Sequence, residues 1–143
     1  MTAARLLEPG GRYIRVMAED LDAIFERLQP LLAEHAPPFV EREGGVQGKR
    51  DYQLWSEKEA VIHGRPRSEV FFAGLIVQKS YVGFYYMPVY AEPERKELFG
   101  PELLGLLKGK SCFYVKRLDD TLLGQVREAL AAGRRLYVER GWI

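Results

Sequence analysis

The sequence contains a single cysteine, Cys112, among 143 residues. An internal disulfide is therefore excluded, and so is a metal site built on several cysteines of one chain. A chain without disulfides suits a reducing interior, and the N-terminal segment has no apolar run long enough for a signal peptide. The aliphatic run at residues 75–77 is far too short to cross a bilayer. These absences predict a cytoplasmic protein that does not enter the membrane.

The sequence also lacks an excess of either charge, since its formal net charge is +1. No global field therefore draws the protein to nucleic acid or to anionic membranes. Its content of 47% hydrophobic and 29% charged residues is that of an ordinary globular domain. We expect residues 1–12 to be a loose lead-in and residues 13–143 to form a single domain.

Two segments have the spacing of amphipathic helices, one near each end of the chain. Apolar residues recur every three or four positions over residues 17–32, which predicts a first helix with Asp20 as its N-cap. Pro30 should kink or restart this helix, because proline has no amide hydrogen. The last helix should begin near Asp119 and carry one apolar stripe as far as Tyr137.

Between these helices apolar residues recur at every second position, which is typical of β-strands. Strands are predicted at residues 51–56, 60–63, 69–78, 80–90 and 110–117. Short polar turns separate the first four, which favours an antiparallel meander. Residues 41–50 should form an exposed loop and residues 92–109 helical turns. The sequence therefore predicts an α+β fold, with both terminal helices on one face of a twisted antiparallel sheet of about five strands.

The segment at residues 79–90 holds four of the chain's eight tyrosines. Alternate residues of a strand face opposite sides of a sheet, so the strands at 80–90 and 110–117 each divide into two rows. The row expected to face the helices consists of Val82, Phe84, Tyr86, Phe113 and Val115. The row expected to face away consists of Tyr81, Gly83, Tyr85, Met87, Cys112, Tyr114 and Lys116.

The outward row predicts a binding surface. Tyrosine buries its ring while its hydroxyl stays in water, and a glycine lets a ligand approach the backbone. Two helices cover only one face of such a sheet, and a large uncovered aromatic face usually marks a docking site. The candidate binding residues are Tyr81, Tyr85, Tyr114 and Cys112, with Lys79, Lys110 and Lys116 near the ends of the surface. Two alternatives stay open: the loops at 36–50 or 92–108 cover this face, or a homodimer does.

Two stretches, FFAGLIVQKSYVGFYYMPVY (residues 71–90) and LLKGKSCFYVKRLDD (residues 106–120), resemble the YdhG-like family of bacterial domains of unknown function. The resemblance runs from about Tyr13 to the C-terminal helix, and its most specific pieces are residues 81–82, 87–90 and 109–113. It implies an α+β fold in which helices back a twisted antiparallel sheet. Part of the wider family is described as frataxin-like, which implies an intracellular iron chaperone. The family supplies no established catalytic residues.

An iron site of that kind needs clustered carboxylates on the first helix, because hard oxygen ligands suit iron. Glu19, Asp22 and Glu26 have the i, i+3, i+7 spacing that places them on one helix face. Arg15 and Arg27 lie nearby, and the balanced charge favours an ordinary solvated face instead. Iron binding by these three carboxylates is therefore the alternative function, and the first interpretation involves no cofactor.

Other kinds of site fail on spacing. Residues 105–111 echo a phosphate-binding P-loop but have three residues, not four, between the glycines. Basic and aromatic residues mix at 110–117 as in RNA-binding sheets, yet the RNP pattern is absent and the neutral charge disfavours nucleic acid. As a nucleophile, Cys112 would need a base and a lowered pKa, and no spacing places His35 or His63 beside it. The sequence therefore predicts a non-enzymatic module that binds a small molecule or a protein; an enzyme using Cys112 is a weaker hypothesis.

Overall fold

The computed structural model describes residues 4–7, 13–16, 19–92, 94 and 99–143, with side chains described from Asp20 onwards. Its helices are α1 (Glu19–Ala33), α2 (Met87–Ala91), α3 (Pro101–Leu104) and α4 (Asp120–Arg140). Among the described residues, the main sheet is six-stranded, in the order β3 (Val40–Arg42), β4 (Asp51–Ser56), β7 (Val70–Val77), β8 (Val82–Tyr86), β10 (Cys112–Val115) and β9 (Leu107–Lys108). The other strands pair as β1 (Ala4–Leu7) with β2 (Tyr13–Val16) and β5 (Ala60–Ile62) with β6 (Arg65–Arg67).

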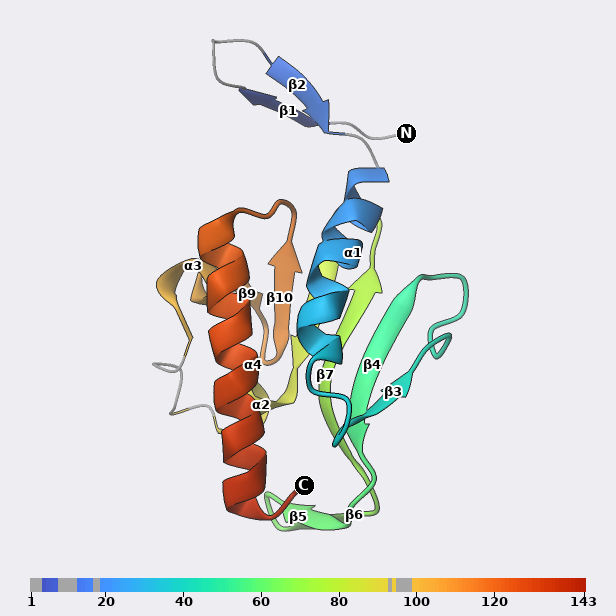
Figure 1. Cartoon of the computed structure of the whole chain (residues 1–143), viewed down its shortest axis with the longest axis vertical. Coiled ribbons are helices and arrows are strands. Elements are labelled where there is room, and N and C mark those ends of the chain that lie inside the picture. Colours follow the sequence, from blue (N-terminus) through green and yellow to red (C-terminus); the bar gives the residue numbers. More distant parts are fainter. Residues whose placement is uncertain (1–3, 8–12, 17–18, 93, 95–98) are drawn as a thin grey trace.

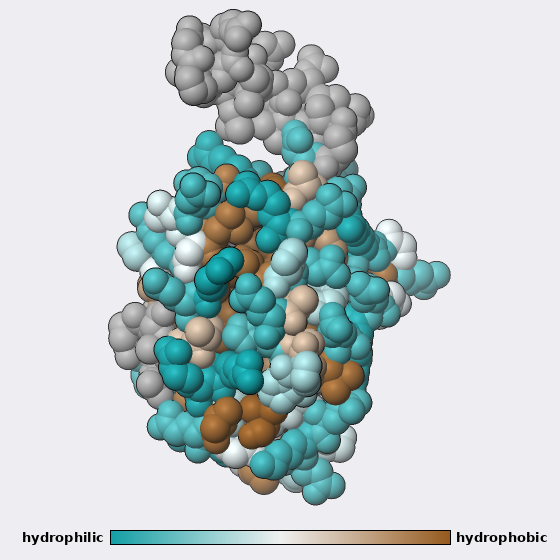
Figure 2. Space-filling model, viewed as in Figure 1, coloured by the Kyte–Doolittle hydropathy of each residue, from teal (hydrophilic) through white to brown (hydrophobic). Residues whose placement is uncertain are grey.

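The two long helices, α1 and α4, lie side by side over one face of the main sheet (Figure 1). Neighbouring strands of this sheet are antiparallel. The predicted α+β fold, with both terminal helices on one face of an antiparallel sheet, is confirmed. The exposed side of the two helices is largely hydrophilic (Figure 2), because their apolar stripes face the sheet. Membership of a YdhG-like or frataxin-like family stays a prediction, and residues 8–12, around the expected end of the lead-in, lie outside the described residues.

The sheet differs from the prediction at its edges. β3 and β9 occur where a loop and helical turns were expected, and they are only three and two residues long. Gly109 has a left-handed φ of 73°, which allows the chain to turn tightly from β9 into β10. The strand expected at 60–63 pairs with β6 in a separate hairpin instead of joining the main sheet.

The strand expected at 80–90 ends at Tyr86, where the chain enters α2. Pro88 stops the strand because it has no amide hydrogen for a sheet ladder, whereas the first turn of a helix needs none. Met87, which was expected in the outward row, is consequently buried in α2.

Both predicted terminal helices are present, but the predicted N-cap is correct only for α4. Asp119 is the N-cap of α4, as predicted, and its Oδ1 accepts a hydrogen bond of 2.8 Å from the amide of Leu122. Asp20 is instead the second residue of α1, which continues through Pro30 without ending. Because Pro30 has no amide hydrogen, only the carbonyl of Glu26 loses its hydrogen bond within the helix. Glu26 is exposed, so water can bond to this carbonyl instead.

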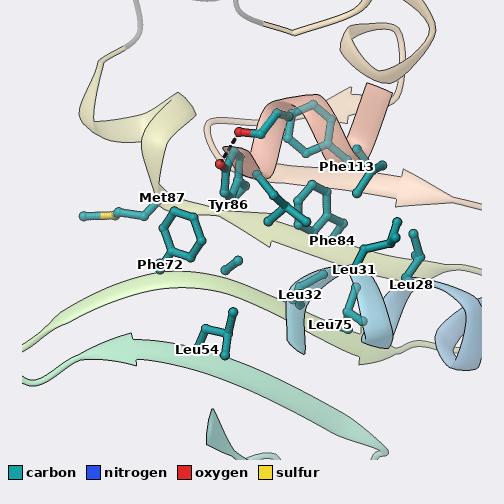
Figure 3. Packing of buried hydrophobic residues seen from close by; sticks show 14 of the residues in the cluster. Leu28, Leu31, Leu32, Leu54, Phe72, Leu75, Phe84, Tyr86, Met87 and Phe113 are labelled. Carbon is teal, nitrogen blue, oxygen red and sulfur yellow. Dashed lines mark hydrogen bonds between the residues drawn. The ribbon is translucent and has the colours of Figure 1, made fainter. Parts of the chain in front are cut away.

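The predicted division of β8 and β10 into two rows is confirmed. The inward row, Val82, Phe84, Tyr86, Phe113 and Val115, has 0% exposure throughout. Figure 3 shows the rings of this row packed together beside leucines of α1. Tyr81, Tyr85, Cys112 and Tyr114 of the outward row are only half-buried. The structure therefore has one sealed and one partly open sheet face.

The close approach of α4 to the sheet depends on Gly133. Tyr86 points its hydroxyl toward α4 and donates a hydrogen bond of 2.5 Å to the carbonyl of Ala129 (Figure 3). A β-carbon at Gly133 would overlap this hydroxyl oxygen and would lie 2.9 Å from Cγ of Pro88. The buried tyrosine thus satisfies its polar atom only because the helix has no side chain at this point.

We predict that Gly133→Ala lowers the free energy of unfolding by about 1–3 kcal/mol, because the fully buried Tyr86 ring has no room to move away. The matched control is Gly124→Ala in the same helix, where nothing lies within 4 Å of the new carbon. That variant should gain about 0.5–1 kcal/mol from its better helix propensity. Urea denaturation of both variants measures the difference. A Gly133→Ala variant as stable as the parent would contradict the packing described.

Candidate ligand-binding groove at the sheet edge

The outer face is the side of the main sheet opposite α1 and α4. Its half-buried aromatic and sulfur-bearing side chains are Trp55, Phe71, Tyr81, Tyr85, Cys112 and Tyr114. Strand register explains why they gather. Tyr85 lies opposite Gly74 of β7 and Cys112 of β10, and Gly83 lies opposite Tyr114. The predicted set of Tyr81, Tyr85, Tyr114 and Cys112 therefore shares one surface.

Two kinds of ring contact organise this surface. The rings of Tyr81 and Tyr114 stack with their centroids 3.8 Å apart and their planes 8° from parallel. The ring of Tyr85 lies over Gly83, where a β-carbon would come within 2.6 Å of it. The glycine was expected to leave room for a ligand, but its space is filled by the chain's own tyrosine.

One of the two loops expected to cover the outer face does so in part. The buried Asp51 carboxylate accepts hydrogen bonds from the amides of Gly44, at 2.8 Å, and Gly45, at 3.3 Å, which draws the loop onto β4. Lys49 of the same loop hydrogen-bonds Gln78, whose Nε2 in turn donates to the Tyr85 hydroxyl at 3.1 Å. This loop therefore contacts the β4 side of the face and is linked to the Tyr85 hydroxyl only through Gln78. Tyr81 and Tyr114 stay half-buried beyond it.

A groove of about 430 Å³ lies beside Tyr114, at the β9–β10 edge of the sheet. It is formed by α3, β9, β10 and the start of α4, and its lining residues are Glu102, Gly105, Leu106, Lys108, Tyr114, Lys116, Arg117, Asp119 and Leu122. Tyr114 and Lys116 were predicted from the sequence. Lys79 and Lys110 lie in exposed turns and do not line it.

Lys108 and Arg117 line the groove but were not among the residues predicted from the sequence. Lys108 was placed in helical turns, although the Lys-Gly-Lys-Ser turn at residues 108–111 was a usable hairpin signal. Arg117 lies just beyond the end of β10, where strand alternation no longer says which way a side chain points.

The cations of the groove are not neutralised by ion pairs. Among the described residues, no carboxylate forms a salt bridge with Lys108, Lys116 or Arg117. The two lining carboxylates are engaged elsewhere: Asp119 caps α4, and Glu102 accepts a hydrogen bond from Gln125. The groove therefore combines an apolar wall with a surplus of positive charge.

The phenols of Tyr81 and Tyr85 and the thiol of Cys112 are neutral at physiological pH. Hydrogen bonding to Tyr114, followed by burial, raises the pKa of Tyr81. Burial likewise raises the pKa of Tyr85 and the pKa of Cys112. A buried thiol favours its protonated form, so Cys112 lacks the activation that a catalytic nucleophile needs.

The carboxylates of the iron hypothesis lie on α1, away from this groove. Arg50 pairs with Asp22 at 3.2 Å and with Glu26 at 3.4 Å, so a cation already sits between them. The side chain of Glu19 lies outside the described residues. Within the part of the chain that the structure describes, no three His, Cys, Asp or Glu side chains form a group able to hold a metal ion. Iron binding stays a prediction without a described ligand cluster.

Comparisons of the chain with protein-family models, curated proteins and solved structures give no match. In the described part of the chain, no helix has both the length and the apolar character needed to span a bilayer. The function has to be argued from the geometry of the chain alone.

We predict that Cys112 reacts slowly with iodoacetamide at neutral pH. Because burial raises the pKa of Cys112, its alkylation rate should rise at a higher pH than that of an ordinary thiol, whose pKa is about 8.5. The rate is measured against pH, and the same protein unfolded in urea provides the reference. A folded-state midpoint below that reference would revive the hypothesis of a catalytic cysteine.

Proposed function

We propose that the protein is a non-enzymatic binding module that takes up a small molecule in the groove beside Tyr114. The observation that carries this proposal is the combination in one concave site of an aromatic ring, apolar side chains and three cations that have no ion-pair partner in the described part of the chain. Small-molecule sites are typically concave, largely apolar and provided with a few polar groups that fix the ligand's orientation. Their usual volumes, about 300–1,000 Å³, include that of this groove.

A small molecule fits this site better than a flat protein partner. A stable protein interface buries about 800 Å² on each side, and its centre is depleted of charged residues. Here three cations and two carboxylates surround a hollow, which suits a ligand that enters it. The alternative is that a protein partner or a second copy of the chain covers the rest of the outer face.

The structure contains a second concave site of similar volume, about 390 Å³, at the β5–β6 hairpin. Its lining residues are Glu59, Ala60, Val61, Pro66, Arg67 and Ser68, with no aromatic ring among them. Because ring stacking contributes to the binding of planar ligands, we assign the ligand to the groove beside Tyr114. The hairpin site provides an internal comparison for the experiment.

The proposal predicts where a neutral planar probe binds. In a titration with indole followed by NMR, the largest shift changes should fall on Leu106, Tyr114 and Leu122. Tyr114→Ala should abolish these changes, because it removes the ring that forms the wall of the groove. Tyr90→Ala, which removes a half-buried tyrosine from α2 instead, should leave them intact.

A thermal melt of each variant, followed by circular dichroism, is the control that shows whether the variant is folded. Shift changes that gather on the β5–β6 hairpin, or that persist in folded Tyr114→Ala, would contradict the proposal. A second copy of the chain on the outer face would appear as a mass near twice 16.4 kDa in light scattering, with Tyr81 and Tyr85 protected.

A further inference from the structure

We propose that the ligand of this groove is a planar aromatic molecule that bears a phosphate group, such as a nucleoside monophosphate. The inference rests on the proposed function, since it names the class of molecule that the groove accepts. The groove combines the end of a ring stack with three cations that form no salt bridge to any carboxylate among the described residues.

The ring stack ends at the groove. Tyr81 packs on one face of Tyr114, and Tyr114, but not Tyr81, lines the groove. Stacking on Tyr81 also holds the Tyr114 ring in place, which lowers the ordering cost of binding. A planar ligand ring can therefore extend a stack that the protein has already formed.

The cations flank this ring. Lys116 follows directly after the end of β10 and lines the groove with Tyr114, and Lys108 lies on the neighbouring strand, where it is opposite Cys112. Arg117 completes the set at the end of β10. Lysine supplies a compact positive charge, and the planar fork of arginine matches the paired oxygens of a phosphate. A ligand that stacks on Tyr114 therefore shares the groove with three cations that can bind its anionic substituent.

The carboxylates of the groove limit the ligand to a small anion. Glu102 and Asp119 line the same hollow, and Asp120 follows in the first turn of α4. A long polyanion that follows the groove onto α4 would meet these acids, whereas one phosphate can lie among the cations. The geometry thus favours a mononucleotide over single-stranded nucleic acid, which generally needs an extended basic track.

The test compares adenosine monophosphate, adenosine and inorganic phosphate by calorimetric titration of the full chain at low salt. Adenosine monophosphate should bind at least about tenfold more tightly than either part alone, because only it uses both ring and cations. Its affinity should fall as salt is added, whereas that of adenosine should not change.

Matched variants separate the two contributions. Lys116→Gln and Arg117→Gln should each weaken binding of the monophosphate about three- to fivefold and leave adenosine unaffected. Lys58→Gln, which removes an exposed lysine from the β4–β5 turn, should change neither. Tyr114→Ala should weaken both adenosine and the monophosphate.

Each outcome decides between the two proposals. Equal affinities for adenosine and its monophosphate would overturn the phosphate inference. So would a Lys58→Gln variant that loses as much affinity for the monophosphate as Lys116→Gln and Arg117→Gln do. In both cases indole binding would still support the groove. Tighter binding of an oligonucleotide than of the monophosphate, per phosphate bound, would overturn it in favour of nucleic acid. If indole, adenosine and the monophosphate all fail to bind the folded protein, the proposed function falls with the inference.

Discussion

The alternation of side chains along β8 and β10 is the constraint on which the other features depend. The inward row of Val82, Phe84, Tyr86, Phe113 and Val115 is sealed beneath the helices, so the intervening residues must face the other way. A shift of one residue would bury the outward phenols and expose the apolar row. The Tyr86 hydroxyl reinforces this register, because it bonds to the carbonyl of Ala129 on α4 and fits there only against Gly133. The inner packing thus determines what the outer face presents.

The outer face has the character of a neutral aromatic surface with a charged edge. Tyr81, Tyr85 and Cys112 carry no charge at physiological pH, since hydrogen bonding and burial raise the pKa of Tyr81 and burial raises the pKa of Tyr85 and of Cys112. Glycine at position 83 lets the Tyr85 ring lie on the backbone, so the central part of the face is filled by the protein itself. The open volume lies beside Tyr114, at the edge where lysines and an arginine are found. Binding is therefore proposed at the edge of the face and not at its centre.

The sequence predicted the features that depend on local spacing and missed those that depend on how distant segments meet. Alternation gave the two rows of β8 and β10, and a capping residue gave the start of α4 at Asp119. The edge strands β3 and β9 were missed because two or three residues carry too little pattern to identify a strand. Tyr114 and Lys116 were identified by their shared row, but Lys108 and Arg117 join them only through the folding of the β9–β10 hairpin beside α4. A binding site at an edge is the kind of feature that local periodicity does not specify.

The fold leaves the phenols of the outward row accessible and seals those of the inward row. Hydroxyl-radical footprinting read by mass spectrometry tests this residue by residue, because the modification rate follows the exposure of each side chain. We expect Tyr81, Tyr85 and Tyr114 to be modified in the native protein. Three tyrosines that are each 0–1% exposed should be modified only after unfolding: Tyr52, Tyr86 and Tyr137. Protection of Tyr81 and Tyr114 in the monomeric protein, or rapid modification of Tyr86, would show that the two rows are not arranged in this way.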